Sequence, residues 1–259
     1  MEEQVIFLSK DGKDRYVNDF AKGSGSIPVN TELFDYDSSN EPIVLRGILK
    51  HKIMKRCWED GRDFYYVDTG YFGNEGTWKY WHRIVKNNLQ HTDIILRPDD
   101  RFKQFKKTIH KWKYGSKIIV ALPDEKPCKF YGIDRDIWIA HTIDALKKHT
   151  DRPIVIRERA KQRQTRINEP LEQALSNDVH ALVTFNSNAA TESVFFGIPV
   201  FTLAPSAAQP VGLQDLSKIE TPYYPTNDER YAWACHLAYG QFHINEMKTG
   251  KAWDILNES

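Results

Sequence analysis

The chain contains few cysteines and no long apolar run. Its three cysteines are far apart among 259 residues and form no Cys-x-x-Cys pair, which disfavours a disulfide framework or a structural zinc site. The absence of about 18 consecutive apolar residues excludes a membrane-spanning helix. The acidic start, residues 1–4, lacks the basic region of a secretory signal. We therefore expect a globular cytoplasmic protein with no membrane partner.

The usual metal-binding patterns are also missing. None of the nine histidines belongs to a His-Glu-x-x-His motif. Asp134 and Asp136 have the spacing of an Asp-x-Asp metal motif, but they stand where a helix should begin. We interpret Asp134 as an N-cap and Asp136 as an acid of the first turn. The sequence therefore predicts no metal site, and we expect no permanently bound cofactor.

The formal net charge of +1 hides local asymmetry. Residues 1–41 carry nine acids against four bases, whereas residues 101–117 carry seven bases and no acid. A second basic zone, residues 157–166, has five bases and one acid. Two concentrated basic zones in a nearly neutral chain favour local contacts with anions over a generally basic surface.

Apolar, β-branched runs alternate with segments of helical spacing in the second half of the chain. Such alternation predicts βαβ units and a parallel sheet covered on both faces. The expected strands are residues 118–122, 154–156, 181–185 and 200–203, and the expected helices are residues 137–148, 168–175 and 189–196.

The first part of the chain is less regular, but it also mixes strands and helices. We expect strands at residues 5–8, 43–48, 64–67 and 94–97, and helices at 49–60 and 101–113. The predicted fold class is α/β with two lobes. The predicted division is an acceptor-side lobe at residues 1–115, a nucleotide-binding lobe at 116–225, and a helical segment at 226–259 that packs back on the first lobe.

Polar and basic residues follow the strands of the second lobe. In parallel sheets ligands bind beyond the carboxyl ends of the strands, where helix N-termini and arginines hold phosphates. A small-residue loop at 204–210 should add a flexible wall. For some candidates a structural role stays open: Ser187 and Asn188 as N-caps, Glu192 as a partner of the helix dipole, Arg157 as a solvated strand end. The candidate donor-binding residues are Lys126, Arg157, Arg159, Ser187, Asn188 and Glu192.

Residues 181–207, ALVTFNSNAATESVFFGIPVFTLAPSA, resemble the nucleotide-sugar half of GT-B glycosyltransferases. The resemblance covers about residues 117–225 and implies two Rossmann-like lobes facing a cleft. It implies that Glu192 holds the donor ribose, that Arg157 with Arg159 holds the diphosphate, and that the donor is a UDP-sugar. The chain departs from the pattern after the first strand of this lobe. No glycine-rich phosphate loop follows that strand, which leaves Lys126 as the basic residue there.

The implied reaction transfers a hexosyl or pentosyl group to a hydroxyl. An inverting transfer needs a base near that hydroxyl. We assign the base to Asp68, which ends a strand of the first lobe just before Thr69-Gly70. His82 and His91 are alternatives, and Asp68 could instead cap an Asx-turn.

The candidate residues for binding the acceptor lie in the basic stretch 101–117. Helical spacing relates Phe102, Phe105, Ile109 and Trp112, which predicts that they form a buried stripe of a helix. The solvent-exposed face of that helix would carry Lys106, Lys107 and Lys111, our candidate acceptor or phosphate contacts. The whole chain resembles small bacteriophage glycosyltransferases, which implies hydroxymethylated pyrimidines of double-stranded DNA as the acceptor. The alternatives are a surface-glycan glycosyltransferase, a nucleotide-sugar epimerase and a non-catalytic nucleic-acid-binding module. The oligomeric state stays open.

Overall fold

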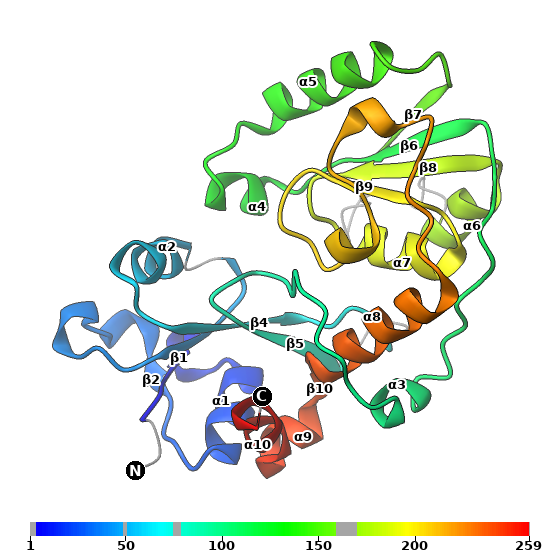
Figure 1. Cartoon of the computed structure of the whole chain (residues 1–259). Helices are drawn as coiled ribbons and strands as arrows, with labels where there is room; N and C mark the ends of the chain where they lie inside the picture. The colour runs from blue at the N-terminus through cyan, green and yellow to red at the C-terminus, as the bar shows by residue number, and fades with distance from the viewer. Residues whose placement is uncertain (1–3, 49–50, 75–78, 159–169, 259) are drawn as a thin grey trace. The chain divides into compact units, whose positions relative to one another are not determined.

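The chain folds into two compact units in a computed structural model, which describes residues 4–48, 51–74, 79–158 and 170–258 (Figure 1). Unit 1 comprises Met1–Leu89 and Leu237–Ser259, and unit 2 comprises Gln90–His236. This division differs from the expected boundaries at residues 115 and 225. Residues 90–114 belong to unit 2 because they pack on it: the Phe102 ring stacks on Phe195, and the His110 N–H donates to the Phe195 carbonyl.

Unit 1 is built on a six-stranded mixed sheet in the order β10-β5-β4-β3-β1-β2. Four strands are parallel, β5 pairs antiparallel with β4, and β10 pairs antiparallel with β5. The expected strands at 5–8, 43–48 and 64–67 are confirmed. The strand expected at 94–97 is wrong, since those residues form no strand and Leu96 is 83% exposed. The bounds are β1 Ile6–Ser9, β2 Val29–Asn30, β3 Ile43–Arg46, β4 Phe64–Thr69, β5 Trp81–Lys86 and β10 Gln241–His243.

The helices of unit 1 begin and end at residues suited to these roles. The Asp14 carboxylate accepts hydrogen bonds from the N–H groups of Tyr16 and Val17 and so caps α1. The helix expected at 49–60 is confirmed, and it closes at Gly61, whose φ of 70° suits glycine. The bounds are α1 Arg15–Gly23, α2 His51–Asp60, α9 Ile244–Thr249 and α10 Lys251–Asn257, with short 3-10 turns at Lys10–Gly12, Thr31–Leu33 and Tyr36–Ser38.

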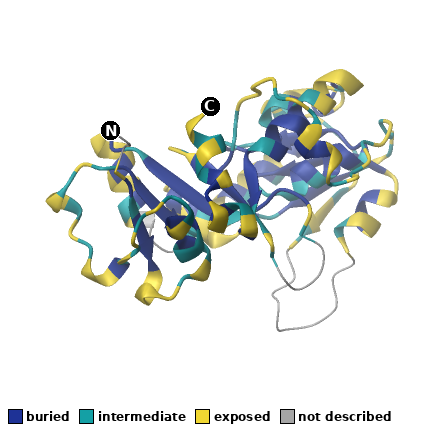
Figure 2. Ribbon diagram, turned by 90° about the horizontal axis from the view of Figure 1, so that it is seen from below, coloured by how far each residue is buried: buried dark blue, intermediate teal, exposed yellow. Residues whose placement is uncertain are grey.

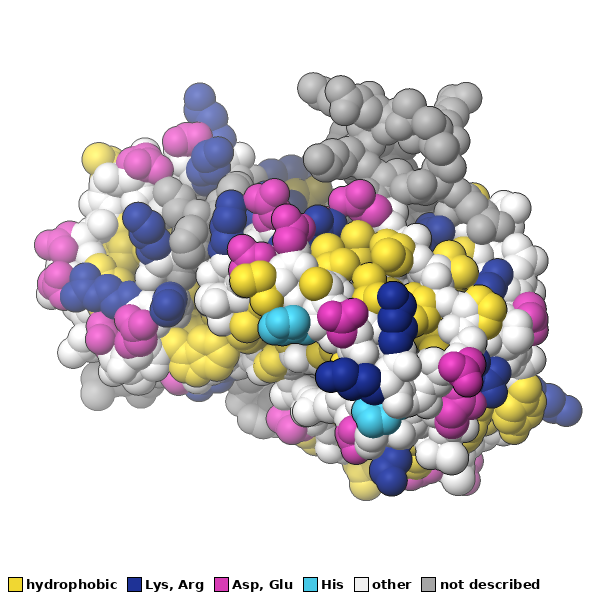
Figure 3. All heavy atoms as spheres, turned by 90° about the horizontal axis from the view of Figure 1, so that it is seen from above, with side chains coloured by type: hydrophobic (Ala, Val, Ile, Leu, Met, Phe, Trp, Pro, Cys, Tyr) yellow, Lys and Arg dark blue, Asp and Glu magenta, His cyan; other side chains and the backbone are white. Residues whose placement is uncertain are grey.

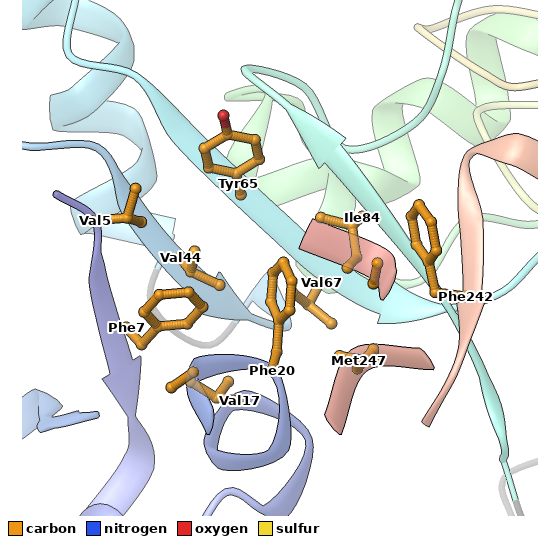
Figure 4. Close-up of a cluster of buried hydrophobic side chains, with 12 residues drawn as sticks. Val5, Phe7, Val17, Phe20, Val44, Tyr65, Val67, Ile84, Phe242 and Met247 are labelled. Carbon is orange, nitrogen blue, oxygen red and sulfur yellow. The ribbon is translucent and has the colours of Figure 1, made fainter. Parts of the chain in front are cut away.

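The C-terminal helices complete the core of unit 1, as the sequence predicted. Figure 4 shows Met247 of α9 and Phe242 of β10 beside side chains of α1 and the sheet. The contact between α1 and α9 is so close that a Cβ on Gly23 would lie 1.9 Å from the Met247 carbonyl oxygen. Glycine is therefore required at this crossing. The buried cluster contains Val5, Phe7, Val17, Phe20, Ala21, Val44, Tyr65, Val67, Ile84, Phe242, Met247 and Ala252.

Unit 2 carries a four-stranded, fully parallel sheet in the order β7-β6-β8-β9. All four expected strands are confirmed. Every residue of β8 and β9 is buried, whereas on the edge strand β7 Val155 is 42% and Ile156 52% exposed. Coverage of both faces therefore holds for the central strands but not for β7, where the prediction is wrong. The bounds are β6 Lys117–Ala121, β7 Ile154–Arg157, β8 Val179–Thr184 and β9 Val200–Thr202.

The helices of unit 2 follow the predicted alternation. Asp134 caps α5 through the N–H groups of Asp136 and Ile137, as predicted. The buried face of α5 carries Trp138, Thr142 and Leu146. The helix expected at 168–175 corresponds to α6, but residues 168 and 169 lie outside the described residues. The bounds are α3 Asp100–Lys103, α4 Glu125–Phe130, α5 Arg135–Lys147, α6 Leu171–Ser176, α7 Ala189–Phe196 and α8 Asn227–Tyr239, with 3-10 turns at Gln209–Val211 and Leu216–Lys218.

The helix expected at 101–113 is wrong, because α3 ends after four residues. The chain then runs as an extended segment to β6, as the trace between α3 and β6 in Figure 1 shows. Lysines three and four residues apart repel one another on a helix, and Lys106 adopts a left-handed φ of 49°. Phe102 is nevertheless buried as expected.

Burial follows the strands in each unit. Figure 2 shows the strands of both sheets mainly in the buried colour, while exposed positions concentrate on helices and turns. Among the described residues, no helix combines the length and apolar character that crossing a bilayer requires.

Candidate functional site

The four parallel strands of unit 2 bring their carboxyl ends to one edge of the sheet. The Leu122 N–H donates to the Arg157 carbonyl at 2.9 Å, and the Thr184 hydroxyl donates to the Ala121 carbonyl at 2.9 Å. The Leu203 N–H donates to the Thr184 carbonyl at 2.9 Å. These bonds hold the ends of all four strands together. Half-buried Arg157 therefore lies at the same edge as the turn that leads into α7.

The start of α7 leaves one amide side chain unused. The Ser187 hydroxyl accepts from the Ala189 N–H at 3.2 Å, whereas the Asn188 side chain makes no capping bond. The Asn188 Oδ1 is buried and has no hydrogen-bond partner in the described part of the chain. Glu192 is half-buried in the first turn of the helix. Ser187 thus acts as a cap, and the Asn188 amide remains available for a ligand.

Two threonine hydroxyls at this edge are also unpartnered. The Thr191 Oγ1 in the first turn of α7 and the Thr202 Oγ1 at the end of β9 are buried and have no partner within the described ranges. Thr202 is paired in register with Thr184, whose own hydroxyl is bonded. A buried hydroxyl without a partner costs free energy. A ligand bound at this edge would provide hydrogen-bond partners for these hydroxyls and remove that cost.

The small-residue segment after β9 is buried, so the expectation of a flexible loop at 204–210 is wrong. Ser206, Ala207 and Ala208 are fully buried. The Ala207 N–H donates to the Gln90 Oε1 at 2.8 Å, and the Trp233 indole donates to the Ala207 carbonyl at 2.6 Å. The Gln90 amide also donates to the Asn186 carbonyl at 2.5 Å. Gln90 thereby ties the β8–α7 turn to this segment. Nothing in the sequence pattern marked it.

The remaining donor candidates are placed less centrally. Lys126 is exposed in the first turn of α4, which follows β6 at the same edge of the sheet. Arg159 lies outside the described residues, so the predicted pair with Arg157 has no structural description. The structure thus brings the strand end at Arg157 together with the α7 start, and it places Lys126 after the strand between them.

The candidate base, Asp68, belongs to unit 1 and lies near the end of β4. Its Oδ2 accepts from the Tyr66 hydroxyl at 2.7 Å and pairs with the Arg83 guanidinium at 3.2 Å, while its Oδ1 accepts from the Thr69 N–H at 2.7 Å. Burial works to raise the pKa of Asp68. The Arg83 charge and the two hydrogen bonds favour the carboxylate and together hold this pKa below its usual range. Asp68 is thus an ionised carboxylate near neutral pH.

Arg83 and Arg46 complete the polar edge of unit 1, and sequence reasoning missed both. Buried Arg83 also donates to the carbonyls of Thr69 at 2.7 Å and Leu89 at 3.0 Å. Arg46 ends β3, pairs with Asp14 at 3.3 Å and lies 4.4 Å over the Tyr16 ring. Arg46 could have been found from its place at the end of a predicted strand, whereas Arg83 lies inside a strand. Strand β5, which carries Arg83, was not predicted.

One of the two alternative bases, His82, is less accessible than Asp68. His82 is fully buried beside Tyr16, and burial together with the Arg46 charge lowers its pKa to about 4. His91, in unit 2, contacts the ring of His236 at 5.4 Å between centroids. A fully buried imidazole cannot meet an acceptor hydroxyl without a rearrangement. This geometry favours Asp68 over His82.

The candidate phosphate contacts lie on the extended segment rather than on a helix. Lys106 and Lys111 are exposed, and the Lys107 ammonium lies 5.3 Å over the Phe195 ring. Acidic and basic side chains are interspersed on the face drawn in Figure 3. Residues 101–117, by contrast, contain no acid.

Comparison with solved structures finds similar folds, among them two Kdo transferases. The chain superimposes on a β-Kdo 2,4 transferase, KpsC of Thermosulfurimonas dismutans, with a TM-score of 0.54, 13% identity and coverage of 90% of each chain. The β-Kdo 2,7 transferase of KpsC from the same organism matches with a TM-score of 0.54, 12% identity and coverage of 99% of each chain. No family model matches the sequence, and no curated protein matches it significantly. The shared fold agrees with the predicted α/β, Rossmann-like class.

Proposed function

We propose that the protein is a glycosyltransferase that uses a nucleotide-sugar donor. The observation that carries this proposal is the edge of the unit 2 sheet, where Arg157, the unused Asn188 amide and the start of α7 lie together. A helix N-terminus and an arginine suit a phosphate, and a half-buried carboxylate such as Glu192 suits ribose hydroxyls. The fold shared with two Kdo transferases supports the same reaction class.

In the proposed reaction the acceptor oxygen attacks the anomeric carbon, and the bond from that carbon to the phosphate oxygen breaks. The leaving phosphate takes the electron pair, and Arg157 and the α7 start stabilise its charge. In an inverting transfer Asp68 takes the acceptor proton and later releases it to water. Arg83 and Tyr66 hold the Asp68 carboxylate in one orientation.

The finer assignments of donor and acceptor extend this proposal. We propose UDP-sugar as the donor and a hydroxyl of double-stranded DNA as the acceptor, on the resemblance of the sequence to bacteriophage glycosyltransferases. The structural similarity to Kdo transferases favours a second candidate, transfer of a sugar acid to a glycan hydroxyl. Product analysis separates these reactions from epimerisation, because an epimerase changes the sugar without an acceptor.

The donor site is tested by thermal unfolding with excess UDP, GDP, CDP or CMP. A nucleotide at about 100 times its dissociation constant stabilises by roughly 2.7 kcal/mol, or about 5–10 °C for a chain of this size. We expect Glu192→Gln to reduce this shift, whereas Glu172→Gln, an exposed acid on α6, should preserve it. The absence of a shift with every nucleotide would reject the donor site.

The role of Asp68 is tested separately by turnover. Asp68→Asn should lower product formation by at least about 100-fold, the scale of general-base catalysis, and leave the nucleotide-induced shift intact. Circular dichroism checks that the variant is folded, and Asp19→Asn serves as a control in unit 1. Near-normal turnover in a folded Asp68→Asn protein would reject Asp68 as the base.

A further inference from the structure

Residues 103–114, here called the basic strip, run on unit 2 from the last residue of α3 through a turn at 104–106 to a segment at 107–114 that forms neither helix nor strand. We propose that the basic strip is a binding surface for single-stranded nucleic acid. At about 3.3 Å per residue, the span from Lys106 to Tyr114 is at most roughly 26 Å. That length accommodates about seven nucleotides at a stacked rise of about 3.4 Å.

The backbone of the basic strip is fixed against the C-terminal end of α7. The His110 N–H donates to the Phe195 carbonyl and the Lys113 N–H to the Gly197 carbonyl, each at 2.8 Å. A Cβ on Gly197 would lie 2.1 Å from the Lys111 carbonyl oxygen, so the strip crosses the helix end in direct contact. The surface is therefore preorganised, and binding need not order the backbone first.

A buried arginine adds a second anchor. Arg230 of α8 is fully buried, donates to the His110 carbonyl at 2.8 Å and lies 4.1 Å from the Trp112 ring centroid. The Trp112 indole in turn donates to the Pro225 carbonyl at 2.9 Å. Residues 110–113 of the strip are thus held against α7 and α8, while Lys106, Lys111 and Tyr114 are exposed to solvent.

The strip carries lysines whose charges are not neutralised by acids. Lys106 and Lys111 are exposed and have no acidic partner in the described part of the chain. The Lys107 and Lys113 ammonium groups lie over the Phe195 and Phe196 rings at 5.3 and 5.2 Å. Of the five lysines in the strip, Lys103 alone pairs with an acid among the residues that the structure describes, namely with Asp99 at 2.8 Å. A row of cations along an extended backbone suits a polymer with regularly spaced phosphates.

An aromatic surface continues the row of lysines. Tyr114 is 78% exposed, which is high for a large ring, and its ring lies 5.4 Å from that of Tyr224. Tyr224 lies 5.4 Å from the Trp112 ring on its other side. The exposed Tyr114 ring offers a face on which a base can stack. Lysines next to an exposed aromatic ring are the combination that single-stranded nucleic acid uses.

Charge density favours nucleic acid over an acidic polysaccharide. A nucleic acid repeats one phosphate and one flat base in each unit, and the strip matches both with five lysines and an exposed tyrosine within twelve residues. A polysaccharide supplies no flat aromatic base for stacking. This inference does not rest on sugar transfer, because binding at the strip can be measured without donor or turnover.

The test is fluorescence anisotropy with a labelled oligothymidylate of about 20 nucleotides at several salt concentrations. Each phosphate contact contributes about 0.7 to the slope of log affinity against log salt. Lys106→Gln with Lys111→Gln should therefore reduce the slope by about 1.4. The matched pair Lys147→Gln with Lys148→Gln, which removes two exposed lysines around the end of α5, should leave it unchanged.

The aromatic contact is tested by Tyr114→Ala, which should raise the dissociation constant at least about 5-fold. Tyr80→Ala, an exposed tyrosine in unit 1, is the control. Equal slopes in the two lysine pairs, or no effect of Tyr114→Ala, would overturn the proposal. Polygalacturonate that displaces the oligonucleotide at equal charge would identify a polysaccharide surface instead, which also overturns it. All strip variants should keep the nucleotide-induced thermal shift. Failure of the nucleic-acid proposal can therefore be distinguished from failure of the donor-site proposal.

Discussion

The carboxyl edges of the two sheets satisfy their polar groups in different ways. In unit 1 the charged groups pair with one another, Asp68 with Arg83 and Asp14 with Arg46, although the Arg46 Nε and both ring nitrogens of His82 have no partner within the described residues. In unit 2 the polar groups at the start of α7 and the end of β9 are small and neutral, and three of their oxygens have no partner within the described residues. The first edge resembles a set of fixed charges, and the second resembles a site that lacks its ligand.

The difference assigns separate tasks to the two edges. The ion pair between Asp68 and Arg83 keeps a carboxylate oriented and ionised, which suits a reacting group. Unpartnered hydroxyl and amide groups carry a free-energy cost that a bound ligand can remove. Four predictions test this contrast.

Removal of the buried guanidinium should affect unit 1 most. Arg83→Met leaves the Asp68 carboxylate and two carbonyls without their partner, and we expect a loss of about 3–5 kcal/mol in the free energy of unfolding. The control Arg152→Met breaks the half-exposed pair with Glu220 in unit 2 and should cost only about 1 kcal/mol. Urea denaturation measures both. Equal losses would show that the network of unit 1 is not specially stabilising.

Acid should destabilise both units through one histidine in each. Burial lowers the pKa of His82 and of His236 to about 4, so between pH 6.5 and pH 4 the unfolded state binds more protons than the folded state. Stability is therefore lost as pH falls through this window, by up to about 3 kcal/mol for each histidine.

The measurement is unfolding free energy against pH for the wild type, His82→Gln and His236→Gln. Each variant should flatten the slope between pH 6.5 and pH 4 relative to wild type. An unchanged slope in His82→Gln would show that this imidazole titrates normally. Comparing the two variants separates the effect of burial from that of neighbouring charges at the carboxyl edge of the unit 1 sheet, because His82 lies beside that edge and His236 is in unit 2.

A change at the helix crossing should weaken unit 1 alone. Gly23→Ala places a methyl group 1.9 Å from the Met247 carbonyl oxygen, and the shift needed to relieve this clash should cost about 2 kcal/mol. Lys22→Ala, an exposed position on the same helix, should cost less than about 0.5 kcal/mol. Hydrogen exchange should locate the loss in α1 and α9. A uniform loss over both units would contradict the prediction.

The smallest effect contrasts two paired threonines of unit 2. Thr184→Val removes a hydroxyl that bonds the Ala121 carbonyl, and it should cost about 1 kcal/mol. Thr202→Val removes an unpartnered hydroxyl and should be neutral or slightly stabilising without ligand. If Thr202 faces the donor, its valine variant should also lower the nucleotide-induced shift. A loss in Thr202→Val equal to that in Thr184→Val would show that the hydroxyl has a partner after all.

The regular helices and strands were predictable because the hydrophobic pattern and the residues that end each element indicate the same structure. The four strands of unit 2 are short apolar runs, and α7 ends at Gly197, whose φ of 78° suits glycine. Strand β5, with Trp81, His82 and Arg83 in sequence, was missed because its polar residues are buried by partners elsewhere in the chain. The partner strand β10 is more than 150 residues away and could not be inferred locally.

The residues of the candidate site were predictable only where their position directly after a strand determines where they lie in the fold. Arg157 and Glu192 follow strands, so the parallel sheet places them at one edge. Gln90 acts through contacts with Asn186 and Ala207, which are far away in sequence, and no local pattern marks it. Arg83 was missed because it lies on β5, which was not predicted. The prediction of a helix at 101–113 was wrong for a related reason. The aromatic residues do have helical spacing, but repulsion between the lysines and the contacts with α7 and Arg230 favour a non-helical chain.

The return of the chain to unit 1 at Leu237 has a consequence for folding during synthesis. Unit 2 is continuous in sequence, so all of its strands leave the ribosome before β10 of unit 1. Unit 1 must wait for its last 23 residues, which supply an edge strand and two helices of its core. We therefore expect unit 2 to fold first on the nascent chain, while the apolar side of α1 lacks its contacts with α9 and α10 until residues 237–259 have been synthesised.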